Sequence, residues 1–192
     1  MRQHILDVAK PIILGKGFSA VGLNEILTAA NVPKGSFYHY FKSKEAFGAA
    51  LLDSYFYDYF GRLELMLAAN DQSAAQRLVA YWDRWLETQA GDCCEEKCLT
   101  VKLAAEVSDL SEAMRISLKR GTDQLIKRLA QCIEEGIADG SLTAALNPQR
   151  TAETLYQMWL GATLLAKVRR EDSSLACAMD STLKLLQLEP SH

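Results

Sequence analysis

The sequence has no long apolar run. No stretch of its 192 residues approaches the roughly 18 consecutive apolar residues that a membrane-spanning helix needs. The N-terminus also lacks the apolar core and the small-residue cleavage site of a signal peptide. We therefore expect a cytoplasmic protein that does not associate with membranes.

Histidine is scarce, which limits the chemistry open to the five cysteines. The three histidines, His4, His39 and His192, lie far along the chain from the cysteines at 93–98. An odd number of cysteines without an export signal is typical of free thiols rather than of a disulfide framework. No histidine or paired carboxylate accompanies Cys98 as a thiol-dependent enzyme requires, so we expect no catalytic residues and no cofactor.

A basic N-terminal segment lies within an acidic chain. Residues 1–50 contain six Lys or Arg and three Asp or Glu, a net charge of +3, whereas the whole chain has a net charge of −3. The acidic remainder disfavours non-specific adhesion of the whole surface to nucleic acid or anionic membrane. A basic segment of this kind suits contact with a polyanion such as nucleic acid, and because its excess of +3 is modest, useful affinity for a duplex requires two copies bound to it.

The first 41 residues predict three helices. Apolar residues follow helical spacing from Ile5 to Ile13 and again from Leu23 to Ala30. Asn31-Val32-Pro33 interrupts the pattern as a turn. Residues 32–44 then predict a third helix about three turns long. Helix, short turn and helix together indicate a helix-turn-helix unit.

The third predicted helix has the composition of a helix that enters a DNA groove. Phe37 and Phe41 stand four residues apart and anchor one face to the core. The other face carries cationic, small and hydroxylated aromatic side chains, which suit phosphate and groove contacts. These candidate DNA contacts are Lys34, Ser36, Tyr38, His39, Tyr40 and Lys44.

Many residues in this region stand at fixed spacing. They are Gly17-Phe18, Ile26 to Val32, Lys34-Gly35-Ser36-Phe37-Tyr38, His39-Tyr40-Phe41 and Ser43-Lys44-Glu45. The run resembles the DNA-binding domain of TetR-type repressors. The resemblance implies an all-α homodimer that binds a palindromic double-stranded operator, with a helix-turn-helix domain at 1–46 and a larger sensor and dimerisation domain at 47–192. It also implies DNA contacts by Lys34, Gly35, Ser36, Tyr38, Tyr40 and Lys44, with His39 beside them.

Two positions depart from the family pattern. Gly22 stands where the family usually has a threonine that caps the second helix and contacts a phosphate, so that contact is in doubt. Pro11 lies inside the first helical pattern, where it removes a backbone donor and should kink the helix.

The rest of the chain also has helical periodicity. Ser43, Ser111 and Asn147 stand where N-caps are expected, and Pro148 follows at a first helical position. A break is predicted near Asp109. The predicted helices span residues 43–69, 73–89, 98–107, 111–138, 147–170 and 173–187.

The last two predicted helices carry little charge. From Thr154 to Val168 the only formal charge is Lys167, and Leu175 to Leu188 has only Asp180 and Lys184. Helices apolar over so much of their circumference must be buried. We expect them to form the dimer interface, as they do in the resembling family; the alternative is a core within one chain.

A second resemblance covers the middle and the end of the chain. It is carried by residues 98–107, 109–112, 114–115 and 160–167. These segments resemble the NemR-type branch of TetR repressors, which responds to reactive electrophiles and oxidants. The resemblance implies that Cys98 is the sensing cysteine and Lys167 its partner.

The position of Cys98 supports this interpretation on chemical grounds. A thiol at a helix N-terminus has its thiolate favoured by the helix dipole, so we expect a lowered pKa and the fastest reaction among the five cysteines. Alkylation or oxidation would add bulk beside the sensor core and reposition the long connecting helix. DNA affinity would then fall.

Alternatives remain open for the other candidate residues. Cys132 and Cys177 are expected to be core residues. Cys93 and Cys94 are either exposed, or resolve an oxidised Cys98, or, through Cys94, help to hold a soft metal. Trp82, Trp85, Tyr156 and Trp159 either line a ligand cavity or fill the core. The same repressor could thus respond to a reversible small-molecule or metal ligand, and a thiol-dependent enzyme is the least favoured function.

Overall fold

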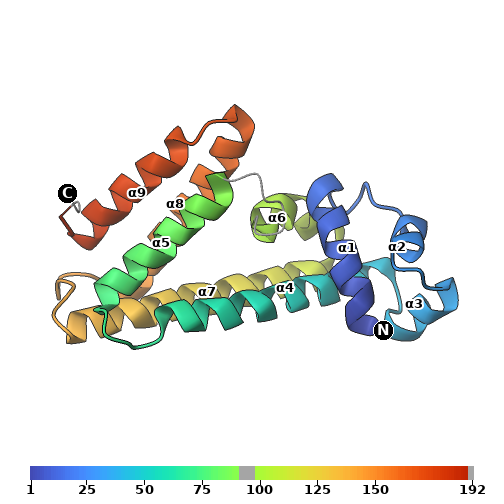
Figure 1. Ribbon diagram of the computed structural model, residues 1–192, viewed down its shortest axis with the longest axis horizontal. Coiled ribbons are helices and arrows are strands. Elements are labelled where there is room, and N and C mark those ends of the chain that lie inside the picture. The colour runs from blue at the N-terminus through green and yellow to red at the C-terminus, as the bar shows by residue number, and fades with distance from the viewer. Residues whose placement is uncertain (91–97, 190–192) are drawn as a thin grey trace. The chain divides into compact units, whose positions relative to one another are not determined.

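The computed structural model describes residues 1–90 and 98–189, and helices joined by short connections account for this part of the chain. The helices are α1 (Arg2–Lys16), α2 (Leu23–Ala29), α3 (Lys34–Tyr40), α4 (Lys44–Leu67), α5 (Ala74–Ala90), α6 (Leu99–Leu110), α7 (Glu112–Ala138), α8 (Pro148–Arg169) and α9 (Ser173–Leu186) (Figure 1). The predicted all-α fold is confirmed. Among the described helices, none is both long and apolar enough to cross a bilayer.

The helices form two compact units. The first unit comprises Met1–Tyr59 and Cys93–Gly121, and the second comprises Phe60–Asp92 and Thr122–His192. Helix α6 therefore belongs to the same unit as α1, α2 and α3, while α4 and α7 each contribute to both units. The domain boundary predicted at residue 46 stays a prediction.

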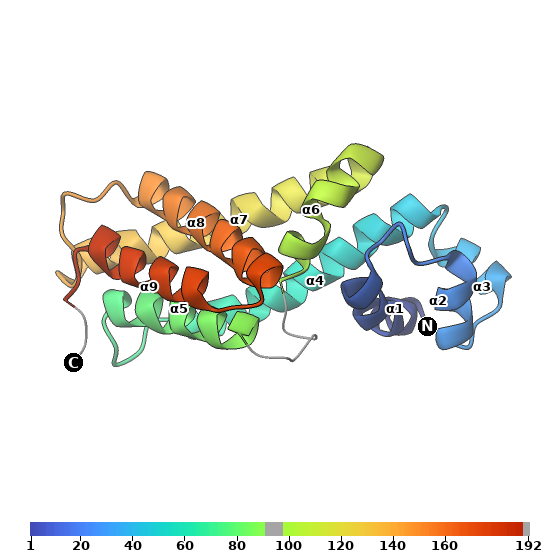
Figure 2. The same ribbon diagram turned by 90° about the horizontal axis from the view of Figure 1, so that it is seen from above.

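In the first unit, α1, α2 and α3 pack against one another (Figure 1 and Figure 2). Ile5, Ile26 and Phe37 are completely buried between them. The rings of Phe37, Phe41 and Phe47 are in mutual contact, with centroids 5.2 to 5.4 Å apart. This cluster fixes the inner face of α3 and ties it to the start of α4, as predicted for Phe37 and Phe41.

The turn between α2 and α3 has a defined hydrogen-bond pattern. Asn31 adopts φ 52°, a left-handed conformation that asparagine tolerates better than most residues. The amide of Val32 donates to the carbonyl oxygen of Leu27 at 3.0 Å, and the amide of Asn31 donates to the carbonyl oxygen of Thr28 at 3.1 Å. These two bonds form a Schellman motif, which ends α2 and redirects the chain into α3.

The third helix is shorter than the sequence suggested. Phe41 adopts extended backbone angles, φ −130° and ψ 116°, so α3 has 7 residues, about two turns rather than three. The hydroxyl of Ser43 then accepts a hydrogen bond from the amide of Ala46 at 3.1 Å, as expected for the N-cap of α4. Lys44 consequently opens α4 and is not part of α3.

Other predicted helix ends are close to those observed. Helix α6 continues past Asp109 to Leu110, and the break falls at Ser111, whose hydroxyl accepts the amide of Met114 at 3.3 Å. Asn147 caps α8 by accepting the amide of Arg150 at 2.9 Å.

Pro11 and Gly22, the two positions that depart from the family pattern, both lie in the first unit. Helix α1 continues on both sides of the exposed Pro11, so this proline does not end it. Gly22 is the N-cap of α2 and provides no side-chain hydrogen bond to the helix.

In the second unit, α9 packs against α8 and α5 (Figure 1). Trp82 and Trp159 are fully buried and stack with centroids 5.1 Å apart and ring planes 10° from parallel. The indole of Trp85 donates to the hydroxyl of Thr163 at 3.0 Å, and that of Trp159 donates to Thr182 at 2.9 Å. These contacts join α5, α8 and α9 around one aromatic core.

Candidate DNA-binding surface and thiol site

The outer face of α3 presents the side chains predicted to contact DNA. Its exposed residues are Lys34, Gly35, Tyr38, His39 and Tyr40, and Ser36 is half-buried. Tyr38 and Tyr40 are 47% and 39% exposed, unusually high for aromatic residues beside a packed helix core. The ammonium of Lys34 lies 5.9 Å from the ring centroid of Tyr38. A helix anchored by phenylalanines thus turns a polar aromatic and cationic face to solvent.

Lys44 has a different environment from the other candidates. Its ammonium donates to the carbonyl oxygen of Phe18 at 3.0 Å and lies 4.8 Å from the centroid of the Phe18 ring. Lys44 lies at the start of α4, directly after the predicted N-cap Ser43, and not on the outer face of α3. Its contact with DNA stays a prediction.

Cys98 is the N-cap of α6, as the sequence predicted. Its side chain is buried, and the hydroxyl of Tyr55 on α4 donates to its sulfur at 3.9 Å. The ring of Tyr55 in turn lies 5.7 Å from the ammonium of Lys10 on α1. Tyr55 therefore contacts both the thiol and the first helix.

The predicted reactivity of Cys98 needs a correction. Burial raises the pKa of the Cys98 thiol; the backbone amides of Val101 and Thr100 and the hydroxyl of Tyr55 favour the thiolate without outweighing burial. The expectation of a lowered pKa is therefore wrong for the structure described here. Desolvation of the charged form exceeds the benefit of the helix N-terminus.

The sequence did not identify Tyr55 as part of this site. The contact joins residues 43 positions apart in the chain, so local spacing does not reveal it. The available signal was a tyrosine within the predicted helix 43–69, since a tyrosine hydroxyl normally finds a hydrogen-bond partner when it is buried.

Lys167 is exposed on α8, in the second unit, whereas Cys98 lies in the first. The pairing of these two residues stays a prediction. Cys93 and Cys94 lie outside the described residues. Over residues 1–90 and 98–189, no group of three or more His, Cys, Asp and Glu residues is arranged to hold a metal ion.

The other two described cysteines differ in burial. Cys132 is fully buried, as predicted, and burial is the main cause that raises its pKa to about 11. Cys177 is exposed, so its expected place in the core is wrong. Leu175, Ala178 and Thr182 occupy the inward face of α9, which leaves Cys177 on the outward face.

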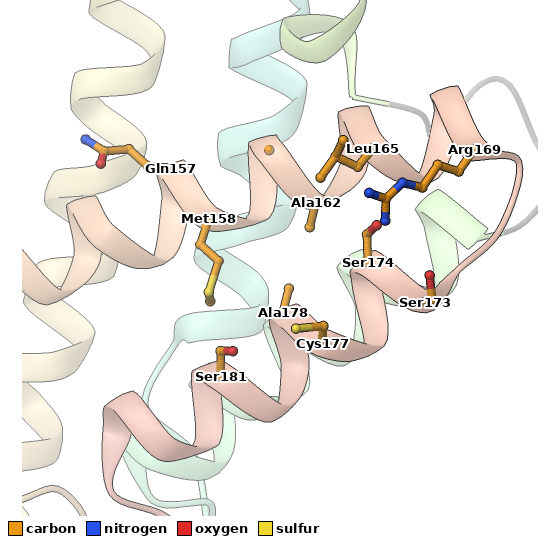
Figure 3. Close-up of a pocket in the computed structure, with 11 residues that line it drawn as sticks. Gln157, Met158, Ala162, Leu165, Arg169, Ser173, Ser174, Cys177, Ala178 and Ser181 are labelled. Atoms are coloured by element: carbon orange, nitrogen blue, oxygen red, sulfur yellow. The ribbon is translucent and has the colours of Figure 1, made fainter.

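Cys177 lies in a groove of about 430 Å³ between α8 and α9 (Figure 3). Met158, Ala162 and Leu165 of α8 face Ala178 and Cys177 of α9 across it. Three large apolar side chains of α8 are also exposed: Leu164, Leu165 and Val168 are 50%, 43% and 71% accessible. The charge-poor helices therefore bury one face within the chain and leave a second apolar face uncovered.

The aromatic residues proposed for a ligand cavity are all buried. Besides the stacked pair Trp82 and Trp159, the ring of Trp85 packs edge-on against Tyr156 at 6.0 Å. These contacts show that the four rings pack against one another in the core. The indole nitrogen of Trp82 is buried without a hydrogen-bond partner.

The chain matches two family models. Residues 5–51 match the model for bacterial regulatory proteins of the tetR family, and residues 74–182 match the tetracyclin repressor-like C-terminal domain. The first match covers α1, α2, α3 and the start of α4, and the second covers α5 to most of α9.

Known proteins share this sequence over nearly its whole length. The HTH-type transcriptional repressor NemR of Escherichia coli (strain K12) is 42% identical over 178 residues, which cover 93% of this chain and 89% of that protein. The HTH-type transcriptional repressor DhaR of Mycobacterium sp. (strain GP1) is 35% identical, covering 91% and 86%. The crystal structure of the reduced form of E. coli NemR superposes with a TM-score of 0.91 at 40% identity, covering 99% of this chain and 98% of that one.

Proposed function

Because this chain belongs to the TetR family and is a DNA-binding transcriptional repressor, we propose that reactive electrophiles or oxidants release it from its operator by modifying Cys98. The observation that carries the proposal is the position of the thiol. Cys98 caps α6, its sulfur accepts the hydroxyl of Tyr55 on α4, and both helix segments belong to the same compact unit as the helix-turn-helix.

The chemical step is the addition of the thiol to an electrophilic carbon. A C–S bond forms, the π-electron pair moves to the neighbouring atom, and that atom takes the proton released by the thiol. The adduct must fit where the hydroxyl of Tyr55 lies 3.9 Å from the sulfur. Interiors are close-packed, so the first turn of α6 and the facing part of α4 have to separate.

The relatives support this proposal. NemR of E. coli is a transcriptional repressor, and its solved structure is that of a reduced form. We propose Lys167 as the amine that pairs with the thiolate or with its modified form in this chain.

The DNA-binding part of the proposal rests on α3 and on symmetry. The exposed face of α3, with Lys34, Tyr38 and Tyr40, is proposed to contact the operator. A second copy is proposed to cover the apolar face of α8 and α9, including Leu165 and Cys177. A two-fold dimer presents two copies of α3 to the two halves of a palindromic operator.

The thiol proposal is tested by limited alkylation. Cys177 is exposed in the single chain and lies on the face that the second copy is proposed to cover, so it competes for reagent wherever that face is free. Cys177→Ser protein is therefore treated with a limiting dose of N-ethylmaleimide and mapped by peptide mass while operator release is followed by fluorescence anisotropy. Release is expected to follow the fraction of Cys98 alkylated. Adding Cys98→Ser should abolish release, whereas adding Cys132→Ser should leave it unchanged, since Cys132 belongs to the second unit and not to the unit that contains the helix-turn-helix.

Release of the Cys98→Ser protein by the same dose would exclude Cys98 as the sensor. The alternative of a reversible ligand with an inert Cys98 would then be favoured.

A further inference from the structure

Helix α6 lies beside the C-terminal end of α1 (Figure 1). Two side chains of α6, one turn apart, contact this end of α1 and the turn that follows it. The carboxylate of Glu106 accepts the backbone amide of Phe18 at 3.2 Å through Oε2 and that of Ser19 at 2.6 Å through Oε1. The ammonium of Lys102 donates to the carbonyl oxygen of Gly15 at 3.3 Å. A carboxylate with two amide donors is a charge-assisted contact, which is stronger than a neutral one.

Gly17 shapes the turn that receives this carboxylate. Its φ of 93° and ψ of 162° lie in a region that essentially only glycine adopts. Its own amide closes α1 by donating to the carbonyl of Ile13 at 2.8 Å. The next two amides, of Phe18 and Ser19, then reach the same carboxylate. A Cβ at residue 17 would lie 3.2 Å from Oε2 of Glu106.

The carboxylate is held as an anion. Burial alone would raise its pKa, but the hydrogen bonds from Ser19 and Phe18 and the charge of Lys102 together lower the pKa of Glu106. Phe18 is itself buried and is linked to the start of α4 through Lys44. The receiving turn is thus part of the packed DNA-binding head, which we define as α1, α2 and α3.

We infer that Glu106 is a positioning residue for operator binding: by holding the amides of Phe18 and Ser19 in the Gly17 turn, it fixes the orientation of the DNA-binding head against α6. The contact joins a sensor helix to a turn 87 and 88 positions earlier. An operator with two half-sites requires a defined separation of the two α3 helices. A head that turns freely would keep its phosphate contacts and lose this defined spacing.

The test uses reduced protein without electrophile, so its outcome is independent of the thiol proposal. Glu106→Gln keeps the size of the side chain but removes the charge. We expect its operator affinity to fall about tenfold, the factor that corresponds to losing one charge-assisted hydrogen bond. Binding to random-sequence DNA of equal length at low salt should be unchanged. Glu112→Gln is the matched control, because that carboxylate pairs with Arg115 on its own helix.

Hydrogen exchange gives a second, direct measurement. The amides of Phe18 and Ser19 should exchange faster in Glu106→Gln, while far-ultraviolet circular dichroism stays that of the parent. Gly17→Ala should have the same effect on operator binding without changing charge, and the double variant should be no worse than the stronger single variant. Unchanged operator affinity, or an equal loss on random-sequence DNA, overturns the inference.

Discussion

At the scale of the residue, two opposing effects act on Cys98. The N-terminus of α6 favours a negative charge on its sulfur, and burial disfavours it. Burial dominates because an ion pays the loss of hydration over its whole surface, whereas the partial charges of the helix end act from one side. The resting site thus protects the thiol, and reagents must reach it when the first turn of α6 opens.

The raised pKa predicts how alkylation depends on pH. The folded state favours the neutral thiol, so the thiolate fraction of Cys98 should be below that of a free cysteine at neutral pH. The alkylation rate should rise about tenfold per pH unit up to roughly pH 8.5, the pKa of free cysteine, without levelling off. The rate is measured by timed alkylation of the Cys177→Ser protein from neutral pH to roughly pH 8.5, followed by peptide mass mapping.

A cysteine-containing peptide is the reference for this profile. A rate that levels off near neutral pH would contradict the raised pKa and restore the interpretation of a thiolate stabilised by the helix N-terminus. The raised pKa of Cys98 also makes the stability of the fold depend on pH. Ionisation of Cys98 is disfavoured in the fold, so its contribution to the free energy of unfolding is present below about pH 8.5 and is lost as pH rises toward the pKa in the fold.

Side-chain properties such as these could be predicted only in part from the sequence. The helical position of Cys98 follows from local pattern, but its burial depends on Tyr55, 43 residues away. The exposure of Cys177 depends on which face of α9 the neighbouring helices cover. Glu106 could not be identified, because its partners are backbone amides of a distant turn and backbone groups carry no sequence signal.

At the scale of the element, α3 divides cleanly between an inner and an outer face. Its inner face is fixed by Phe37, so substitutions on the outer face should change binding without changing the fold. Lys34→Ala is expected to weaken binding to all DNA sequences and to reduce the slope of log affinity against log salt by about 1, because one phosphate contact is lost. Fluorescence anisotropy at four salt concentrations measures this slope.

Lys127→Ala on α7 removes the same charge from an exposed position in the other unit and serves as the control. An unchanged slope for Lys34→Ala, or an equal change for the control, would mean that Lys34 does not contact DNA.

The positions of the helices were predicted from the sequence better than the environments of single side chains. The 3.6-residue period and the caps at Ser43 and Asn147 located the long helices to within a few residues. The third helix was predicted too long because the apolar spacing continues to Phe41, whereas this residue leaves the helix to pack against Phe47. A tertiary contact there overrides the local pattern.

At the scale of the whole molecule, operator binding should depend on the apolar face of α8 and α9. Leu165→Arg places a charge at the groove where the second copy is proposed to pack. We expect monomers in analytical ultracentrifugation and a loss of operator affinity of roughly 10²-fold or more, since two linked heads gain that much from simultaneous binding. Far-ultraviolet circular dichroism should be unchanged.

Leu65→Arg is the matched control for this variant. Leu65 is a leucine of α4 that is 80% exposed. A dimeric Leu165→Arg protein with normal affinity would exclude this face as the interface.

The aromatic core of the second unit also has an optical consequence. All three tryptophans of the chain, Trp82, Trp85 and Trp159, lie in that one cluster, and two of their three indole nitrogens donate to threonine hydroxyls. The intrinsic tryptophan emission of the chain therefore comes from this cluster and responds to the packing of α5, α8 and α9. The DNA-binding head contains no tryptophan, so a change in tryptophan emission in an unlabelled sample reports on the second unit and not on the head.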